Sequence, residues 1–130
     1  MHRKVIGALL FILLMVPAPS KGHQWTPTYP VWRPSYVDDV HVVTMKLFNS
    51  RGDIEYYEIQ VLDVDFNPVP YASAERIMNV GHLKRKVVDI YVSSNDIERA
   101  VYICSRSKSL EGSESKTVVA SRICSKSKLQ

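Results

Sequence analysis

The chain has 130 residues, with 17 basic and 13 acidic side chains, a formal net charge of +4 and only two cysteines. This length predicts one domain with a single modest core. A net charge this small gives no support for nucleic-acid binding. Seven basic residues lie between Arg99 and the end, against Glu111 and Glu114. They form either a solvated basic surface or a face that attracts an acidic protein partner.

Residues 1–22 have the layout of a secretory signal peptide. A short basic start precedes an apolar run from Val5 to Val16, and small residues follow at Ala18 and Ser20. The run is shorter than the about 20 residues that a membrane span needs, although an uncleaved signal anchor remains an alternative. We therefore expect export, cleavage after Ser20 or Gly22, and no membrane insertion after cleavage.

Residues 23–36, HQWTPTYPVWRPSY, are rich in proline and aromatic residues and have no helical periodicity. Proline has no N–H to donate to a sheet, which confines it to sheet edges and loops. The segment is therefore predicted to be an extended leader that feeds an edge strand. The folded domain is expected to cover residues 37–130.

From residue 37 onward, apolar and polar residues alternate with the period of a β-strand. Val43, Met45 and Leu47 share one face of the first such run. The runs are short, rich in β-branched and aromatic residues, and separated by turn residues, which is typical of an antiparallel sandwich or barrel. Residues 72–81 are read as irregular or as a single turn. The predicted fold is an all-β, immunoglobulin-like antiparallel sandwich of about seven strands, and the clearest runs cover 40–48, 55–64, 86–92, 100–105 and 117–124.

The two cysteines lie in nearly identical strings, ICSRSK at 103–108 and ICSKSK at 123–128. Two copies do not make a repeat array. Neither cysteine has a second Cys or a His within five positions, which argues against a zinc site. Cysteines in an exported chain usually pair. We therefore predict a Cys104–Cys124 disulfide across a hairpin formed by the last two strands.

No catalytic constellation is found in the sequence. It contains no nucleophile elbow, no glycine-rich phosphate loop and no metal-binding helix motif. Asp63 and Asp65 form the nearest thing to an acid pair, and their position before FNP indicates a turn. The chain is therefore not expected to be an enzyme or to hold a metal or a cofactor.

Three further features depend on strand order. Arg33 lies in the extended segment that feeds the edge strand, and the strand predicted at 40–48 is followed directly by Asn49. An acidic D-I-E at 96–98 precedes the aromatic strand that holds the first cysteine. Lys126 follows Cys124 at a distance of two residues.

With these features, residues 31–128 resemble the N-terminal immunoglobulin-like domain of the periplasmic pilus chaperones of the chaperone–usher pathway. The branch with a disulfide between the last two strands is the most similar. That family has a second domain, and this sequence ends just after the last strand of the first. The resemblance implies a bacterial host and a periplasmic location.

The resemblance also implies a function and site residues. Arg33 and Lys126 would grip the C-terminal carboxylate of a pilin-like subunit by charge-assisted hydrogen bonds. The strand from Thr117 to Cys124, with Val118 and Ala120, would add its edge to that subunit. The implied function is a chaperone-like binding module that assists assembly of a surface or secretion structure. The alternative is a structural component of an envelope or secretion complex with this fold and no chaperone activity.

Overall fold

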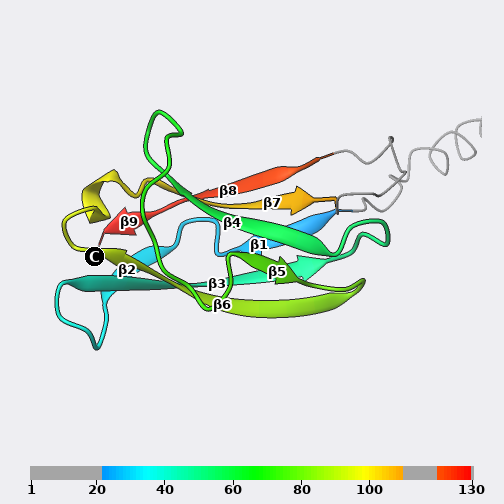
Figure 1. Ribbon diagram of the computed structural model, residues 1–130, viewed down its shortest axis with the longest axis horizontal. Coiled ribbons are helices and arrows are strands. Elements are labelled where there is room, and N and C mark those ends of the chain that lie inside the picture. The colour runs from blue at the N-terminus through cyan, green and yellow to red at the C-terminus, as the bar shows by residue number, and fades with distance from the viewer. Residues whose placement is uncertain (1–21, 110–119, 130) are drawn as a thin grey trace, which may run out of the picture.

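The computed structural model describes residues 22–109 and 120–129. The described chain folds into two β-sheets packed face to face (Figure 1). A 3₁₀ turn, η1 (Ile97–Arg99), interrupts the strands, and no helix in the described ranges is long and apolar enough to span a bilayer. The strands are β1 (His23–Thr26), β2 (Val31–Pro34), β3 (Val40–Asn49), β4 (Tyr56–Leu62), β5 (Ile77–Asn79), β6 (Lys84–Ser93), β7 (Tyr102–Lys108), β8 (Arg122–Lys126) and β9 (Lys128–Leu129).

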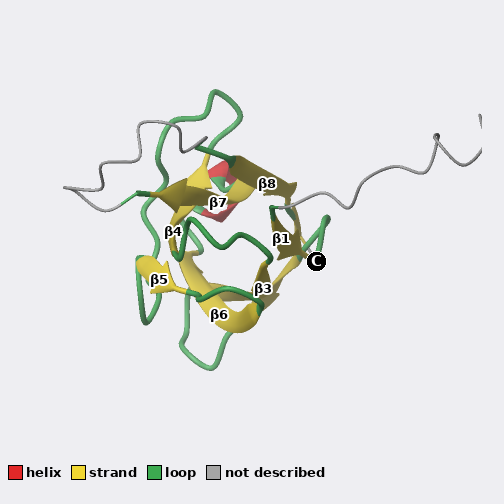
Figure 2. Ribbon diagram, turned by 90° about the vertical axis from the view of Figure 1, so that its right-hand side faces the viewer, coloured by secondary structure: helices red, strands yellow, loops and turns green. Residues whose placement is uncertain are grey.

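The first sheet is built around β3. β6 pairs with it antiparallel along its whole length, while β1 and β2 share its other side, and β9 runs parallel to β2. The second sheet has the order β5-β4-β7-β8. Figure 2 looks along the sandwich and shows the two sheets enclosing the core.

The predicted all-β, immunoglobulin-like sandwich is confirmed. Nine strands are described, but β1 and β2 both lie along the same side of β3, and one residue, Ser127, separates β8 from β9. If each of these pairs is counted as one interrupted strand, seven remain, as the sequence predicts.

Residues 23–36 are part of the sandwich, which corrects their assignment as a leader before a domain at 37–130. β1 and β2 pair with β3, and Trp25 and Trp32 are only 3% and 1% exposed. Their indole N–H groups donate to the carbonyl oxygens of Ile103 and Ala100, at 3.0 and 3.4 Å. The prolines at 27 and 30 stand between β1 and β2, so they interrupt the strand without excluding it from the sheet. The described fold therefore starts at His23.

The predicted alternation is confirmed in β3, β4 and β6. The residues expected to face the core are at most 6% exposed, namely Val43, Met45, Leu47, Tyr57, Ile59, Val61, Val88, Ile90 and Val92. Two details differ from the prediction. The segment 72–81 contains the short strand β5, whose central Met78 is fully buried. Strand β8 begins at Arg122, so Ala120 and Ser121 precede it, while residues 117–119 of the predicted strand lie outside the described residues.

Asn49 is the last residue of β3, and its side chain makes four hydrogen bonds. Its amide nitrogen donates to the carbonyl oxygens of Ile54 and Val80, both at 2.8 Å. Its amide oxygen accepts from the Tyr57 hydroxyl at 2.6 Å and from the Arg51 backbone N–H at 2.9 Å. An asparagine side chain offers two donors and one oxygen with two lone pairs, so the bonding capacity of this buried group is complete.

The signal peptide predicted for residues 1–22 lies outside the described residues, apart from Gly22.

Candidate functional site

β8 is an edge strand of the second sheet. Among the described strands it pairs only with β7. Two bonds just beyond its ends fix the phase of the ladder. The Ser107 N–H donates to Ser121 O and the Ser127 N–H donates to Val101 O, both at 2.8 Å. Hydrogen-bonded and non-hydrogen-bonded pairs alternate in an antiparallel ladder, so these two bonds assign every residue of β8.

The assignment leaves one side of β8 open. Ile123 and Ser125 direct their N–H and C=O groups toward β7. Arg122, Cys124 and Lys126 direct theirs to the other side, where no described strand pairs with β8. Such a row of exposed backbone groups is a template for another strand.

A disulfide fixes this edge in place. Cys104 and Cys124 lie directly opposite each other in a non-hydrogen-bonded pair, with their Cα atoms 4.1 Å apart. The bond predicted from the sequence is therefore confirmed. It ties β8 to β7 at the centre of the strand.

An aromatic side chain lies across the outer face of this hairpin. Phe66, in the turn after β4, stacks on Tyr102 with ring centroids 4.8 Å apart and planes 5° from parallel. The Arg122 guanidinium lies 5.4 Å from the Phe66 ring centre. Tyr102 and Arg122 stand on either side of the cysteine pair in the register, so Phe66 bridges across it. Cys104 is fully buried, while Cys124 is half-buried.

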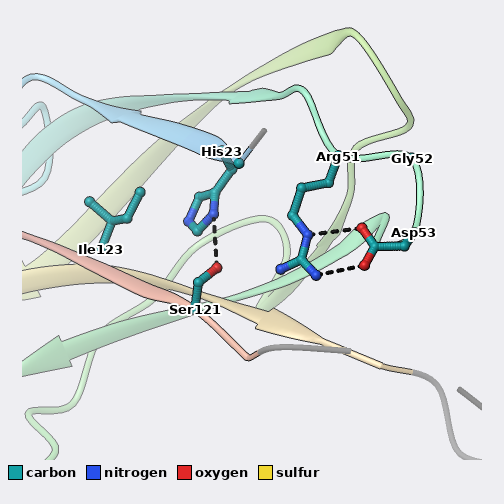
Figure 3. A pocket seen from close by; sticks show the side chains of 7 residues that line it. His23, Arg51, Gly52, Asp53, Ser121 and Ile123 are labelled. Carbon is teal, nitrogen blue, oxygen red and sulfur yellow. Dashed lines mark hydrogen bonds and ion pairs between the residues drawn. The ribbon is translucent and has the colours of Figure 1, made fainter. Parts of the chain in front are cut away.

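On the inner side, an open pocket of about 650 Å³ separates the start of β1 from the start of β8 (Figure 3). His23 points from β1 across this gap. One imidazole nitrogen lies 3.0 Å from the Ser105 hydroxyl, and the other lies 3.4 Å from the Ser121 hydroxyl. Ile123 lines the same gap and packs partly against the core. The pocket can therefore receive a small side chain from a segment that lies along β8.

The pocket is lined by one neutral titratable side chain, His23, and by the ion pair of Arg51 and Asp53. Burial lowers the pKa of His23 below its usual value, opposed by its hydrogen bond with Ser105 and reinforced by the nearby Arg51 cation. The imidazole is therefore neutral at pH 7. The Arg51 guanidinium donates two hydrogen bonds to Asp53, at 2.9 and 2.7 Å, and these hold the pKa of that carboxyl below its usual range.

The structure does not bring Arg33 and Lys126 into one site. Arg33 follows the buried Trp32, so it faces outward from the first sheet, where it lines a pocket with Asp89 and Tyr91. Lys126 lies on the second sheet opposite Tyr102 and lines a different pocket, at the end of the sandwich.

The other two predicted partner-binding residues are Ala120 and Val118. Ala120 is exposed and precedes the strand, and Val118 lies outside the described residues. The acid pair predicted to be a turn is confirmed as one, because Asp63 Oδ1 accepts from the backbone N–H groups of Asp65 and Asn67, both at 2.9 Å. Within residues 22–109 and 120–129, no three His, Cys, Asp or Glu side chains cluster as a metal site would require.

His23 was not predicted as a site feature, whereas the family resemblance implied that the edge of the last strand, from Thr117 to Cys124, binds the partner. The signal for His23 is its distance of two residues from Trp25, because residues two apart in a strand share a face. The open side of β8 depends on the phase of the ladder, which the sequence does not carry.

Comparisons with known proteins place the fold. No protein-family profile matches the chain, and no curated protein matches it in sequence. Among solved structures, the E. coli chaperone DraB matches with a TM-score of 0.60 and 14% identity, covering 82% of this chain and 53% of DraB. The periplasmic chaperone SfaE matches with a TM-score of 0.53 and 10% identity, covering 84% of this chain and 57% of SfaE.

The chain thus spans about half the length of the chaperones that it matches. The predicted resemblance to the chaperone fold is confirmed. Both matched structures are chaperones rather than enzymes, and at this level of identity the likeness establishes the fold alone.

Proposed function

We propose that the protein is a chaperone-like binding module, exported to the periplasm, that assists assembly of a surface or secretion structure. The mode of binding is strand addition at the open side of β8. The observation that carries the proposal is the row of outward backbone groups at Arg122, Cys124 and Lys126, on a fold shared with periplasmic chaperones.

Two features favour β8 over the other sheet edges. The disulfide holds it rigidly, which lowers the entropy cost of ordering an edge for a partner. β5 has only three residues, and the outer side of β6 is partly occupied, because Tyr91 and Ala72 exchange backbone hydrogen bonds of 2.8 and 2.9 Å. Short or covered edges are poor templates for strand addition.

The carboxylate grip is a separate part of the proposal and rests on the family resemblance. Lys126 lies at the end of the open edge, so it is placed to meet a carboxylate at the end of an added strand. Arg33 lies on the other sheet and would make a second contact with the partner, apart from that carboxylate.

A substitution at the first residue of β8 tests the strand addition. Arg122→Pro removes an outward N–H, and proline is tolerated at the first position of an edge strand. Arg122→Ala removes the same charge but keeps the N–H. Tagged forms of both should be recovered from periplasmic extract of the host, and their partners identified by mass spectrometry.

We expect the Pro variant to bind its partner about tenfold or more weakly than the Ala variant, and to recover correspondingly less of it. A lost hydrogen bond and a distorted edge cost roughly 1.4 kcal/mol or more of binding free energy. Equal recovery by the two variants would contradict strand addition. Recovery only within a complete assembly at fixed stoichiometry would favour a structural component.

A further inference from the structure

We propose that the segment added to β8 is acidic, with two carboxylates four residues apart and small apolar side chains between them at alternate positions. This inference rests on the proposed strand addition and specifies its partner.

The outer face of the β7–β8 hairpin carries an excess of positive charge, since Glu58, which lies opposite Arg106, is the acidic residue that meets the basic side chains of β7 among the described residues. Arg122 and Lys126 are exposed at the two ends of β8, and Arg106 lies directly opposite Arg122. No described carboxylate forms an ion pair with any of the three. The one ion pair on this face joins Lys108 to Glu58 at 3.5 Å. Arg122 contacts the Phe66 ring instead, which fixes its direction over the outer face.

The pleat of the sheet determines which side chains of an added strand would lie beside Arg122 and Lys126. Directly opposite residues on neighbouring strands point to the same face. Partner residues opposite Arg122 and Lys126 therefore point outward beside these cations, and they stand four residues apart. Opposite charges in such pairs stabilise a sheet, while like charges destabilise it.

The alternate partner positions point inward. A side chain opposite Ile123 enters the gap between β1 and β8, whose walls include Ile123, the neutral His23 imidazole and the Arg51 guanidinium, which already binds the Asp53 carboxylate. This gap is a poor place for a carboxylate that would lose its hydration. The inward positions are therefore small and apolar.

The same charges argue against a second copy of this chain as the occupant. If two β8 strands paired antiparallel about Cys124, Arg122 of each copy would lie opposite Lys126 of the other. Both ends of the ladder would then hold pairs of like charges. The resulting repulsion disfavours pairing between two copies of β8, whereas an acidic strand would be attracted.

Synthetic peptides test the proposal against the full exported chain. An acidic peptide centred on Glu-Val-Thr-Val-Glu, a Lys-Val-Thr-Val-Lys peptide and a Gln-Val-Thr-Val-Gln peptide are compared by fluorescence anisotropy at low salt. We expect the acidic peptide to bind at least about tenfold more tightly than the Gln peptide, and the Lys peptide to bind most weakly. The double variant Arg122→Glu, Lys126→Glu should reverse this order.

Backbone methylation separates strand addition from simple charge attraction. The acidic peptide is N-methylated either at its central threonine or at a neighbouring valine. Only one of these amides faces β8 in a given strand direction, so we expect one methylated peptide to lose about tenfold in affinity and the other to bind unchanged. If neither methylated peptide lost affinity, or if both did, the proposed backbone pairing between the peptide and β8 would be wrong.

The remaining outcomes distinguish the two proposals. If none of the three peptides binds, strand addition at β8 fails and the proposed function fails with it. If all three bind alike and one methylation still weakens binding, strand addition holds and the acidic preference is overturned.

Discussion

Backbone polar groups are hydrogen-bonded at the end of β3 but have no described strand partner along the open edge of β8. At the first, the side chain of Asn49 satisfies buried carbonyl oxygens of Ile54 and Val80 and leaves nothing for a partner. At the second, the described chain leaves a row of backbone groups open, although a disulfide holds them in place. Buried polar groups stabilise a fold only when they are paired. Groups that remain unpaired at a rigid edge are available for binding instead.

The largest expected effect comes from removing the paired site. Asn49→Ala leaves two carbonyl oxygens and the Tyr57 hydroxyl without their partner in the core, and we expect the free energy of unfolding to fall by about 3–5 kcal/mol. Denaturant unfolding measures the loss. Tyr57→Phe is the matched control, since it removes only one of the four bonds and should cost about 1 kcal/mol. A loss under 1 kcal/mol for Asn49→Ala would show that water replaces the asparagine at little cost.

The second effect concerns what holds the open edge. Cys104→Ser or Cys124→Ser should lower the unfolding free energy by about 2–4 kcal/mol, because the bond closes a loop between residues 20 apart in sequence. The double variant should lose no more than either single variant. Partner binding should weaken as well, since β8 would lose its anchor at the centre of the strand. Unchanged stability in the presence of reductant would mean that β8 is held by packing alone.

The third effect separates the two predicted cations. Lys126→Ala should weaken partner binding by about 2 kcal/mol, roughly 30-fold, if it holds a carboxylate at the end of the added strand. Arg33→Ala should cost less, because Arg33 lines a pocket on the other sheet. Lys108 is the matched control, being basic and already paired with Glu58. Equal, salt-dependent losses for all three would reduce the site to a general electrostatic attraction.

The smallest effect is a pH dependence at the pocket beside β8. Burial lowers the pKa of His23 in the folded chain, so the unfolded chain binds more protons as the pH falls below about 6.5. Stability should therefore be fully present above that pH, decrease as the pH falls, and stop decreasing below the folded-state pKa. His23→Gln should remove this part of the dependence in denaturant unfolding measured from pH 7.5 to 5. The same slope in the variant would assign it to other titrating groups.

The fold was predictable because alternation is a local property. The periodicity of β3, β4 and β6 located their buried residues, and two cysteines in a chain that was expected to be exported predicted the disulfide. Residues 23–36 were misassigned because the prolines obscured two short strands, although Trp25 and Trp32 are the kind of large apolar residues that a small core needs.

The site was less predictable because it depends on side-chain direction. Arg33 and Lys126 stand near the ends of the first and last strands, which suggested a shared site. Trp32 faces the core, however, so Arg33 must face outward from the first sheet. The last strand changes sheets at Ser127, so Lys126 belongs to the second sheet while Lys128 pairs with β2.

The two cysteines of the disulfide differ in how easily a solvent thiol can reach them. Cys104 is fully buried, whereas Cys124 is partly exposed on the edge strand. In thiol–disulfide exchange, an attacking thiolate must reach one of the two sulfurs. It can approach Cys124 and form a mixed disulfide there, with Cys104 as the leaving thiolate, held in the sheet. The Cys104 thiolate remains beside the mixed disulfide. It can attack the Cys124 sulfur, release the external thiol as a thiolate and restore the original disulfide without any unfolding of the domain.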